Sequence, residues 1–111
     1  MMGLAVSSLD LPVVKGTTCI LVLDRNDARV YEEKDCIRCG RCIRSCPVGL
    51  MPNFIADAAK LKNWDKTAEY HVADCIECGC CAYECPSRIY LVQYFKAAKW
   101  ELQVRSKAVC Q

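Results

Sequence analysis

The sequence has no apolar segment long enough to cross a membrane and no pattern typical of export. The run CILVL, residues 19–23, is five residues long, whereas a helical span needs about twenty. The first residues, MMGLAVSSLDLP, lack the basic start and the long apolar run of a signal peptide. These absences argue against a membrane-spanning protein and against a secreted disulfide framework. We therefore expect a chain in a reducing compartment, either soluble or peripheral to a membrane.

Two binding signatures are also missing. No run of Lys and Arg with interleaved aromatic residues occurs, so the sequence does not support nucleic-acid binding. Residues 1–34 contain no glycine-rich phosphate turn, so nothing in that segment is suited to FMN or NADH. The formal net charge of +2 gives no further indication of a polyanionic partner.

Cysteine, in contrast, is abundant. The 111 residues include 11 cysteines, an odd number. A domain of this size buries only about two thirds of its unfolded surface and often needs an additional cross-link. Because the sequence argues against secretion, metal-bound thiolates explain the cysteines better than disulfide bonds do.

Eight of the cysteines occupy equivalent positions in the two copies of a repeated motif. The stretch DCIRCGRCIRSCP, residues 35–47, returns as DCIECGCCAYECP at residues 74–86, and seven of the twelve positions from the first cysteine to the proline are identical. The identical positions are the four cysteines, an isoleucine, a glycine and the proline. The repeat therefore preserves metal ligands and turn residues.

The spacing of these cysteines predicts two 4Fe–4S clusters. Thiolate is a soft ligand that suits zinc, copper(I) and iron–sulfur clusters, so ligand type alone does not identify the metal. Three cysteines at i, i+3 and i+6 can wrap three corners of a cubane, and in two-cluster ferredoxins the fourth cysteine, before a proline, binds the other cluster. One predicted ligand set is Cys36, Cys39, Cys42 and Cys85, and the other is Cys75, Cys78, Cys81 and Cys46. Paired zinc sites are the main alternative.

Other residues of the motifs have predicted structural roles. Gly40 and Gly79 suit a left-handed backbone in the wrapping loops, where amide N–H groups point at sulfur. Pro47 and Pro86 end each motif, and their rings are expected to shield the clusters from water. The cysteines outside the spacing are predicted not to be ligands: Cys80 as a buried free thiol, and Cys19 and Cys110 as reduced bystanders. The lone His71 is predicted to be structural.

The two motifs differ in charge. The first carries Arg38, Arg41 and Arg44, whereas the second carries Glu77 and Glu84. Because local charge contributes to cluster potential, one hypothesis gives the cluster of the first motif the higher potential. The alternatives are that these charges are simply solvated, or that the arginines form a basic docking face.

The predicted fold is mainly α-helical, with a short N-terminal β segment. The sequence of residues 11–31 predicts two strands. Residues 1–34 as a whole are expected to be a β segment left from a larger upstream domain. Residues 35–111 are expected to form a helical domain that binds both clusters. Within it we predict one helix from Pro52, with Phe54, Ala58 and Leu61 on one face and Ile55 and Ala59 beside them, and a second after Asn63, extending to His71. A long amphipathic helix should carry Leu91, Phe95, Ala98 and Leu102 on one stripe.

The phrases MMG, SLDLPVVKGT and CPVGLMPN, together with the two cysteine runs, resemble the C subunit of the Rnf electron transport complex. That complex couples electron transfer between ferredoxin and NAD to ion movement across the bacterial inner membrane. The resemblance implies an all-helical dicluster fold, and it carries over to the eight cluster cysteines one by one. Family members are much longer, and their FMN and NADH chemistry belongs to a part that precedes the matched region.

The resemblance also implies function, partners and location. It implies an electron-transfer module that relays single electrons within a membrane-associated oxidoreductase. The module is then peripheral, at the cytoplasmic face of the inner membrane. Its implied partners are the other proteins of the complex and a redox protein. No catalytic residue is expected in this chain. Two alternatives stay open: a free ferredoxin-like carrier or the iron–sulfur subunit of another dehydrogenase, such as a fumarate or heterodisulfide reductase, and a non-redox interaction module in which the clusters are structural.

Overall fold

The structure, a computed structural model, describes residues 6–28 and 30–109, with side chains as far as residue 107. The chain divides into two units, one of residues 3–32 and the other made mainly of residues 33–111. The second unit holds all the helices of the described residues: α1 (Arg41–Arg44), α2 (Pro52–Lys60), α3 (Trp64–Glu69), the 3-10 helix η1 (Val72–Asp74), α4 (Cys80–Tyr83) and α5 (Leu91–Val109). The mainly helical class predicted from the sequence is therefore confirmed.

The predicted N-terminal strands are wrong for the described residues. Residues 6–28 and 30–32 form turns and irregular chain, with backbone hydrogen bonds from Thr17 to Val14 and from Ala28 to Asp24. The β-branched residues that suggested strands are exposed, for example Val22 at 89%. A strand is stabilised by pairing and by a buried face, and this segment has neither. Its propensity alone therefore does not produce a sheet.

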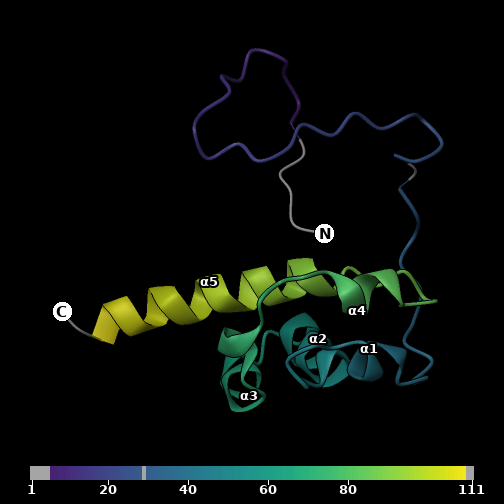
Figure 1. The fold of residues 1–111 in the computed structure, drawn as a ribbon. Coiled ribbons are helices and arrows are strands. Elements are labelled where there is room, and N and C mark those ends of the chain that lie inside the picture. The colour runs from purple at the N-terminus through teal and green to yellow at the C-terminus, as the bar shows by residue number, and fades with distance from the viewer. Residues whose placement is uncertain (1–5, 29, 110–111) are drawn as a thin grey trace. The chain divides into compact units, whose positions relative to one another are not determined.

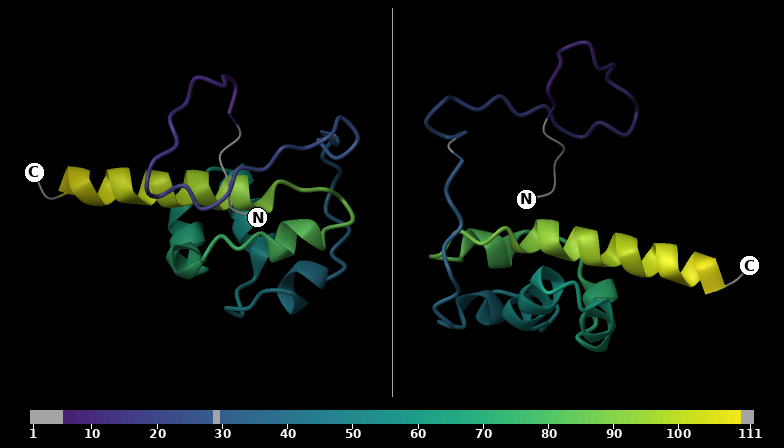
Figure 2. Two further views of the ribbon diagram at one scale, coloured as in Figure 1. Left: turned by 45° about the horizontal axis from the view of Figure 1, so that its top comes forward. Right: turned by 180° about the vertical axis from the view of Figure 1, so that it is seen from behind.

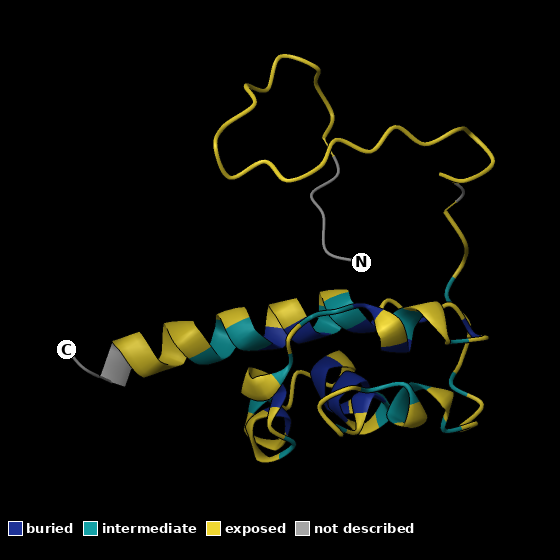
Figure 3. Cartoon of the chain, in the orientation of Figure 1, coloured by how far each residue is buried: buried dark blue, intermediate teal, exposed yellow. Residues whose placement is uncertain are grey.

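Helix α5 forms one side of the helical unit and packs on α2 and α3, as Figures 1 and 2 show. Leu91, Phe95 and Ala98 are 2%, 1% and 0% exposed, and Leu102 is partly buried, so the predicted apolar stripe is confirmed. Buried residues are concentrated where α5 meets α2 (Figure 3). Within the described ranges, no helix has the length and hydrophobicity of a membrane span.

The starts of the predicted helices are confirmed, and of the apolar residues predicted to lie together on α2, Ile55, Ala58 and Ala59 are buried. Pro52 occupies the first turn of α2, and the side chain of Asn63 accepts a hydrogen bond from Lys66 N at 3.2 Å to cap α3. Ile55 is fully buried together with the alanines of α2, whereas Phe54 is 46% and Leu61 80% exposed. Two apolar stripes lie side by side on α2, and the one with small alanines allows α5 to approach closely.

A polar cluster fixes the segment that leads into the first cysteine motif. The carboxylate of Glu33 pairs with Lys60 of α2 and accepts a hydrogen bond from the Tyr94 hydroxyl of α5 at 3.0 Å. The Lys60 ammonium also lies 5.2 Å from the centre of the Tyr94 ring. Next along the chain, Lys34 N donates to the carbonyl of Ser87 at 3.0 Å. The first motif therefore begins from a fixed position beside the end of the second.

Candidate metal centres

The cysteine repeat is also a repeat of backbone conformation. Left-handed residues occur at the same three offsets in each motif: Arg38, Gly40 and Gly49 in the first, with φ of 52°, 72° and 74°, and Glu77, Gly79 and Arg88 in the second, with φ of 57°, 81° and 54°. The expectation that Gly40 and Gly79 adopt this conformation is confirmed. The left-handed conformation of Arg38, Glu77 and Arg88 was not predicted from the sequence, because arginine and glutamate give no local indication of a left-handed backbone.

These loops direct backbone N–H groups at sulfur. Arg38 N donates to Cys36 Sγ, and Glu77 N donates to Cys75 Sγ, both at 3.4 Å. Leu50 N donates to Cys46 Sγ at 3.3 Å. Such bonds stabilise negative charge on sulfur. The wrapping loops are therefore built to hold thiolates.

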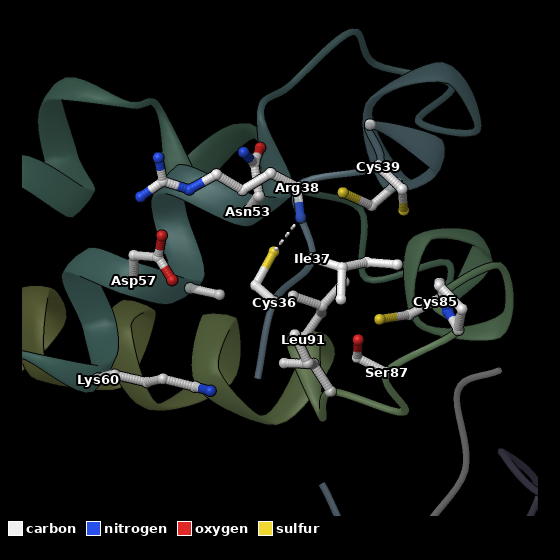
Figure 4. Close-up of a pocket in the computed structure, with 15 residues that line it drawn as sticks. Cys36, Ile37, Arg38, Cys39, Asn53, Asp57, Lys60, Cys85, Ser87 and Leu91 are labelled. Carbon is white, nitrogen blue, oxygen red and sulfur yellow. Dashed lines mark hydrogen bonds between the residues drawn. The ribbon is translucent and has the colours of Figure 1, made fainter. Parts of the chain in front are cut away.

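One pocket brings together cysteines from both motifs (Figure 4). Cys36, Cys39 and Cys42 of the first motif line it, and Cys85 of the second completes the set. Its other walls include Ile37, Ile89, Leu91 and Pro86, while Arg38, Asn53, Asp57 and Lys60 line the polar side. These four cysteines are the first ligand set that the spacing predicted.

A second pocket has the complementary composition. Cys75, Cys78 and Cys81 line it together with Cys46 of the first motif. Pro47 and Phe95 contribute to walls that are mainly apolar. Each pocket thus takes three cysteines from one motif and one from the other, and each contains the proline that follows its exchanged cysteine.

The exchange results from the positions of α1 and α4, which contact each other. Cys42 lies in α1 and lines the first pocket, whereas Cys46 follows the end of that helix and lines the second. Cys81 and Cys85 repeat this arrangement around α4. A single helical turn therefore separates the ligands of one pocket from those of the other.

Burial makes three of these thiols poor acids. Burial raises the pKa of Cys42, where nearby Cys36 and Cys85 add to the effect, and it raises the pKa of Cys75, to which Cys46 adds. Burial raises the pKa of Cys81 to about 12. Thiolates at these positions need a compensating cation, and metal binding displaces their protons. The donor set, four sulfur atoms in a largely apolar pocket, fits an iron–sulfur cluster.

Helix α5 reaches back to the second wrapping loop through Lys99. The Lys99 ammonium lies 2.9 Å from Glu77 Oε1 and donates to the carbonyl of Cys75. Both side chains of this pair are about four-fifths buried, at 21 and 19% exposure. A second lysine, Lys96, lies 3.9 Å from Glu77. The negative charge of Glu77, one of the two acidic residues of this motif, is therefore offset by lysines from a distant helix.

Among the described residues, Cys19, Cys80 and His71 line neither pocket. Cys80 is exposed, so the expected burial of its thiol is wrong, because the first residue of α4 points away from the core. Cys19 is exposed, and Cys110 lies outside the described residues. His71 is left-handed, with φ of 56°, and its imidazole is 4.0 Å from Asp74. In the described part of the chain, no group of three or more His, Cys, Asp and Glu side chains is placed to hold one metal ion.

Known proteins resemble this chain over most of its length. It is 45% identical over 102 residues to the C subunit of the proton-translocating ferredoxin:NAD(+) oxidoreductase complex of Clostridium ljungdahlii, covering 91% of this chain and 22% of the relative. It is 45% identical over 111 residues to the C subunit of an ion-translocating oxidoreductase complex of Pasteurella multocida, covering 96% and 13%. The C subunit of the Na(+)-translocating ferredoxin:NAD(+) oxidoreductase complex of Acetobacterium woodii is 43% identical over 102 residues, covering 92% and 23%.

The chain thus spans less than a quarter of the length of these relatives. The expected resemblance to the C subunit of Rnf-type complexes is confirmed for this portion. A family profile described as a 4Fe-4S dicluster domain matches residues 28–86, which include both cysteine motifs. This protein belongs to the 4Fe–4S dicluster domain family.

Proposed function

We propose that residues 35–111 bind two 4Fe–4S clusters and relay single electrons between them. Cys36, Cys39, Cys42 and Cys85 hold one cluster, and Cys75, Cys78, Cys81 and Cys46 hold the other. The observation that carries this proposal is the division of eight cysteines between two pockets, three and one from each motif. A 4Fe–4S cluster accepts and returns one electron, which is the chemistry it would supply at each site.

The chain's own residues prepare these sites for that role. Backbone N–H groups directed at sulfur stabilise the negative charge of the ligands. Apolar walls that include Leu91 at one pocket and Phe95 at the other limit the access of water. Because α1 and α4 contact each other, and the cysteine within each helix and the cysteine that follows it line different pockets, the two clusters are held close together. No separate substrate-binding active site is needed for this function.

We further propose that this module works within an Rnf-type complex, an ion-translocating ferredoxin:NAD oxidoreductase. Similarity to C subunits over 91–96% of this chain supports that assignment. The other proteins of the complex are then its partners, and its location is peripheral, at the cytoplasmic face of the bacterial inner membrane. Any FMN or NADH chemistry belongs to a part of the longer relatives that this chain does not match.

Iron and sulfide analysis with anaerobic EPR during stepwise reduction tests the cofactor. We expect about eight iron and eight sulfide per chain and two magnetically coupled centres that reduce reversibly with dithionite. A colourless anaerobic preparation, or one that holds single zinc ions, contradicts the proposal.

Paired serine variants test the exchanged ligands. Cys85→Ser should perturb the cluster of Cys36, Cys39 and Cys42 and leave the other cluster as a single, uncoupled 4Fe–4S EPR signal, and Cys46→Ser should have the opposite selectivity. Cys19→Ser is the control, because its exposed thiol lines neither pocket and its loss should leave both signals unchanged. If Cys85→Ser instead alters the cluster of its own motif, the exchanged assignment is wrong.

A further inference from the structure

We propose that Arg38, Arg41 and Arg44, here called the arginine face, form the docking surface for an acidic redox protein that exchanges electrons with the cluster of Cys36, Cys39, Cys42 and Cys85. The inference rests on the proposed electron-transfer function and extends it to the chemistry of a partner. One electron leaves the reduced partner, which is oxidised by one equivalent, and enters the cluster pair of this chain. No bond is made or broken in this exchange.

The arginine face is exposed, and its first member, Arg38, lines the first pocket. The three arginines recur every third residue along the wrapping loop and α1, and all are exposed. Arg38 lines the first pocket, as Figure 4 shows, and the neighbouring ligand Cys39 is itself exposed. Arg41 and Arg44 line a shallow depression with Ser45 and Glu84. A partner bound here would lie next to the solvent-facing edge of the cluster site.

The positive charge of this face is not neutralised by ion pairs within the described part of the chain. Arg38, Arg41 and Arg44 form none of its ion pairs, although Asp57 lines the same pocket as Arg38 and Glu84 lines the depression. Like charges at such short intervals repel one another, and they contribute little to stability on an exposed surface. Their charge is therefore available to an external partner.

The second motif shows that the fold does not require these arginines. Its equivalent positions are Glu77, Cys80 and Tyr83, on a backbone with the same left-handed offsets. Glu77 is turned inward and paired with Lys99, while Cys80 and Tyr83 are exposed and uncharged. Because the same local structure forms without arginine, a structural requirement does not explain the three arginines of the first motif. Of the two motifs, the first alone carries arginines at these three positions.

Charge complementarity identifies the class of partner. A surface with three exposed guanidinium groups attracts carboxylates, and such complementarity raises association rates by about 10- to 1,000-fold at low salt. The sequence lacks the interleaved aromatic residues that typically accompany nucleic-acid binding, and the face adjoins a redox site. These observations favour an acidic protein with a redox centre close to its carboxylate face.

Stopped-flow reduction of the reconstituted holoprotein tests the proposal, with a reduced acidic 2Fe–2S ferredoxin as the probe. We compare Arg41→Gln/Arg44→Gln with Lys62→Gln/Lys107→Gln, which removes two positive charges from exposed lysines elsewhere. At low salt the arginine variant should react about tenfold more slowly than wild type, and the lysine variant within about twofold of it. Near 1 M salt, where the Debye length is about 3 Å, all three rates should agree within about twofold.

Three outcomes overturn the docking proposal: equal losses in the two variants, a wild-type rate that does not depend on salt, and a loss in the arginine variant that persists at high salt. The last of these would indicate a changed driving force rather than changed association. Reduction by dithionite separates this failure from that of the proposed function. If dithionite reduces all variants but the salt dependence is absent, only the docking proposal fails, whereas clusters that dithionite does not reduce contradict electron transfer itself.

Discussion

The ion pair of Lys99 with Glu77 provides a sharp test of how α5 supports the second cluster site. At 2.9 Å and an effective dielectric constant of about 20, the gross Coulomb attraction is about 6 kcal/mol. Desolvation of two side chains that are about four-fifths buried offsets most of that attraction. We expect a net stabilisation of about 1 to 2 kcal/mol, between the values typical of exposed and fully buried pairs.

Lys99→Met removes this pair and the hydrogen bond to the carbonyl of Cys75, and it leaves Glu77 with only the more distant Lys96. We expect the second cluster to be lost about 5- to 30-fold faster when the holoprotein is held at a fixed guanidinium concentration without oxygen. The measurement is the decay of visible absorbance, with EPR to identify which cluster disappears first. Loss of one positive charge beside Cys75 should also lower the midpoint potential of that cluster.

A double-variant cycle with Glu77→Gln separates the pair from general damage. Removing both charges should cost less than the sum of the single changes, with a coupling energy of about 1 kcal/mol. Lys96→Met is the matched control on the same helix, and because Lys96 is 3.9 Å from Glu77 and half exposed, we expect at most a twofold effect. If Lys99→Met behaves like Lys96→Met, or if the two single effects are simply additive, the reasoning is refuted.

Four further predictions follow from the same geometry. Tyr94→Phe removes a hydrogen bond to the Glu33 carboxylate and should destabilise the holoprotein by about 1 kcal/mol, measured as a lower thermal midpoint for loss of cluster absorbance; an unchanged midpoint contradicts the role of this bond. Gly40→Ala places a Cβ on a residue with φ of 72° and should cost about 1 kcal/mol by backbone strain, because no protein atom beyond the neighbouring residues lies within 4 Å of the added Cβ; equal denaturation curves would exclude strain. The side chain of Asn53 lines the first pocket, and its buried Oδ1 has no hydrogen-bond partner among the described residues; rotation of the carboxamide by 180° would let Nδ2 donate into the pocket. Asn53→Leu removes this donor and should lower the midpoint potential of the first cluster alone. Unchanged potentials argue against such a donor. Arg38→Glu should also lower the first potential if local charge tunes it, and a potentiometric titration with both midpoints unmoved rules tuning out.

The structure changes the basis of the tuning hypothesis. From sequence, the second motif appears acidic, because Glu77 and Glu84 occupy its loop and helix. In the fold, Lys96 and Lys99 of α5 lie beside Glu77, so the charge contrast between the two sites is smaller than the motifs alone indicate. These lysines lie far from the loop along the chain, and only tertiary packing brings them to it.

The eight cysteines that line the two pockets could be predicted from sequence, because cluster binding imposes a strict local spacing. A loop that wraps a cubane needs sulfur at every third residue, and the repeat marks the same positions twice. The starts of α2 and α3 could also be predicted from sequence, since Pro52 and Asn63 act through local backbone chemistry. The buried stripe of α5 followed from its helical period.

Other features depended on neighbours that the local sequence does not specify. The exposure of Cys80, the inward turn of Glu77 and the choice of Ile55 over Phe54 as a core residue each depend on which helix packs nearby. The expected strands of residues 11–31 failed for the same reason, because a strand needs a partner that β propensity does not provide.

The sequence by itself determined the number, spacing and chemical class of the proposed metal ligands, because those properties depend on residues a few positions apart. Tertiary structure decided how the surroundings of the two sites differ. The packing of α5 supplies lysines to one loop, while the three arginines beside the other loop remain exposed and without ion pairs among the described side chains. That difference depends on long-range packing and burial, since two nearly identical local backbones acquire different electrostatic environments only when distant helices lie against them.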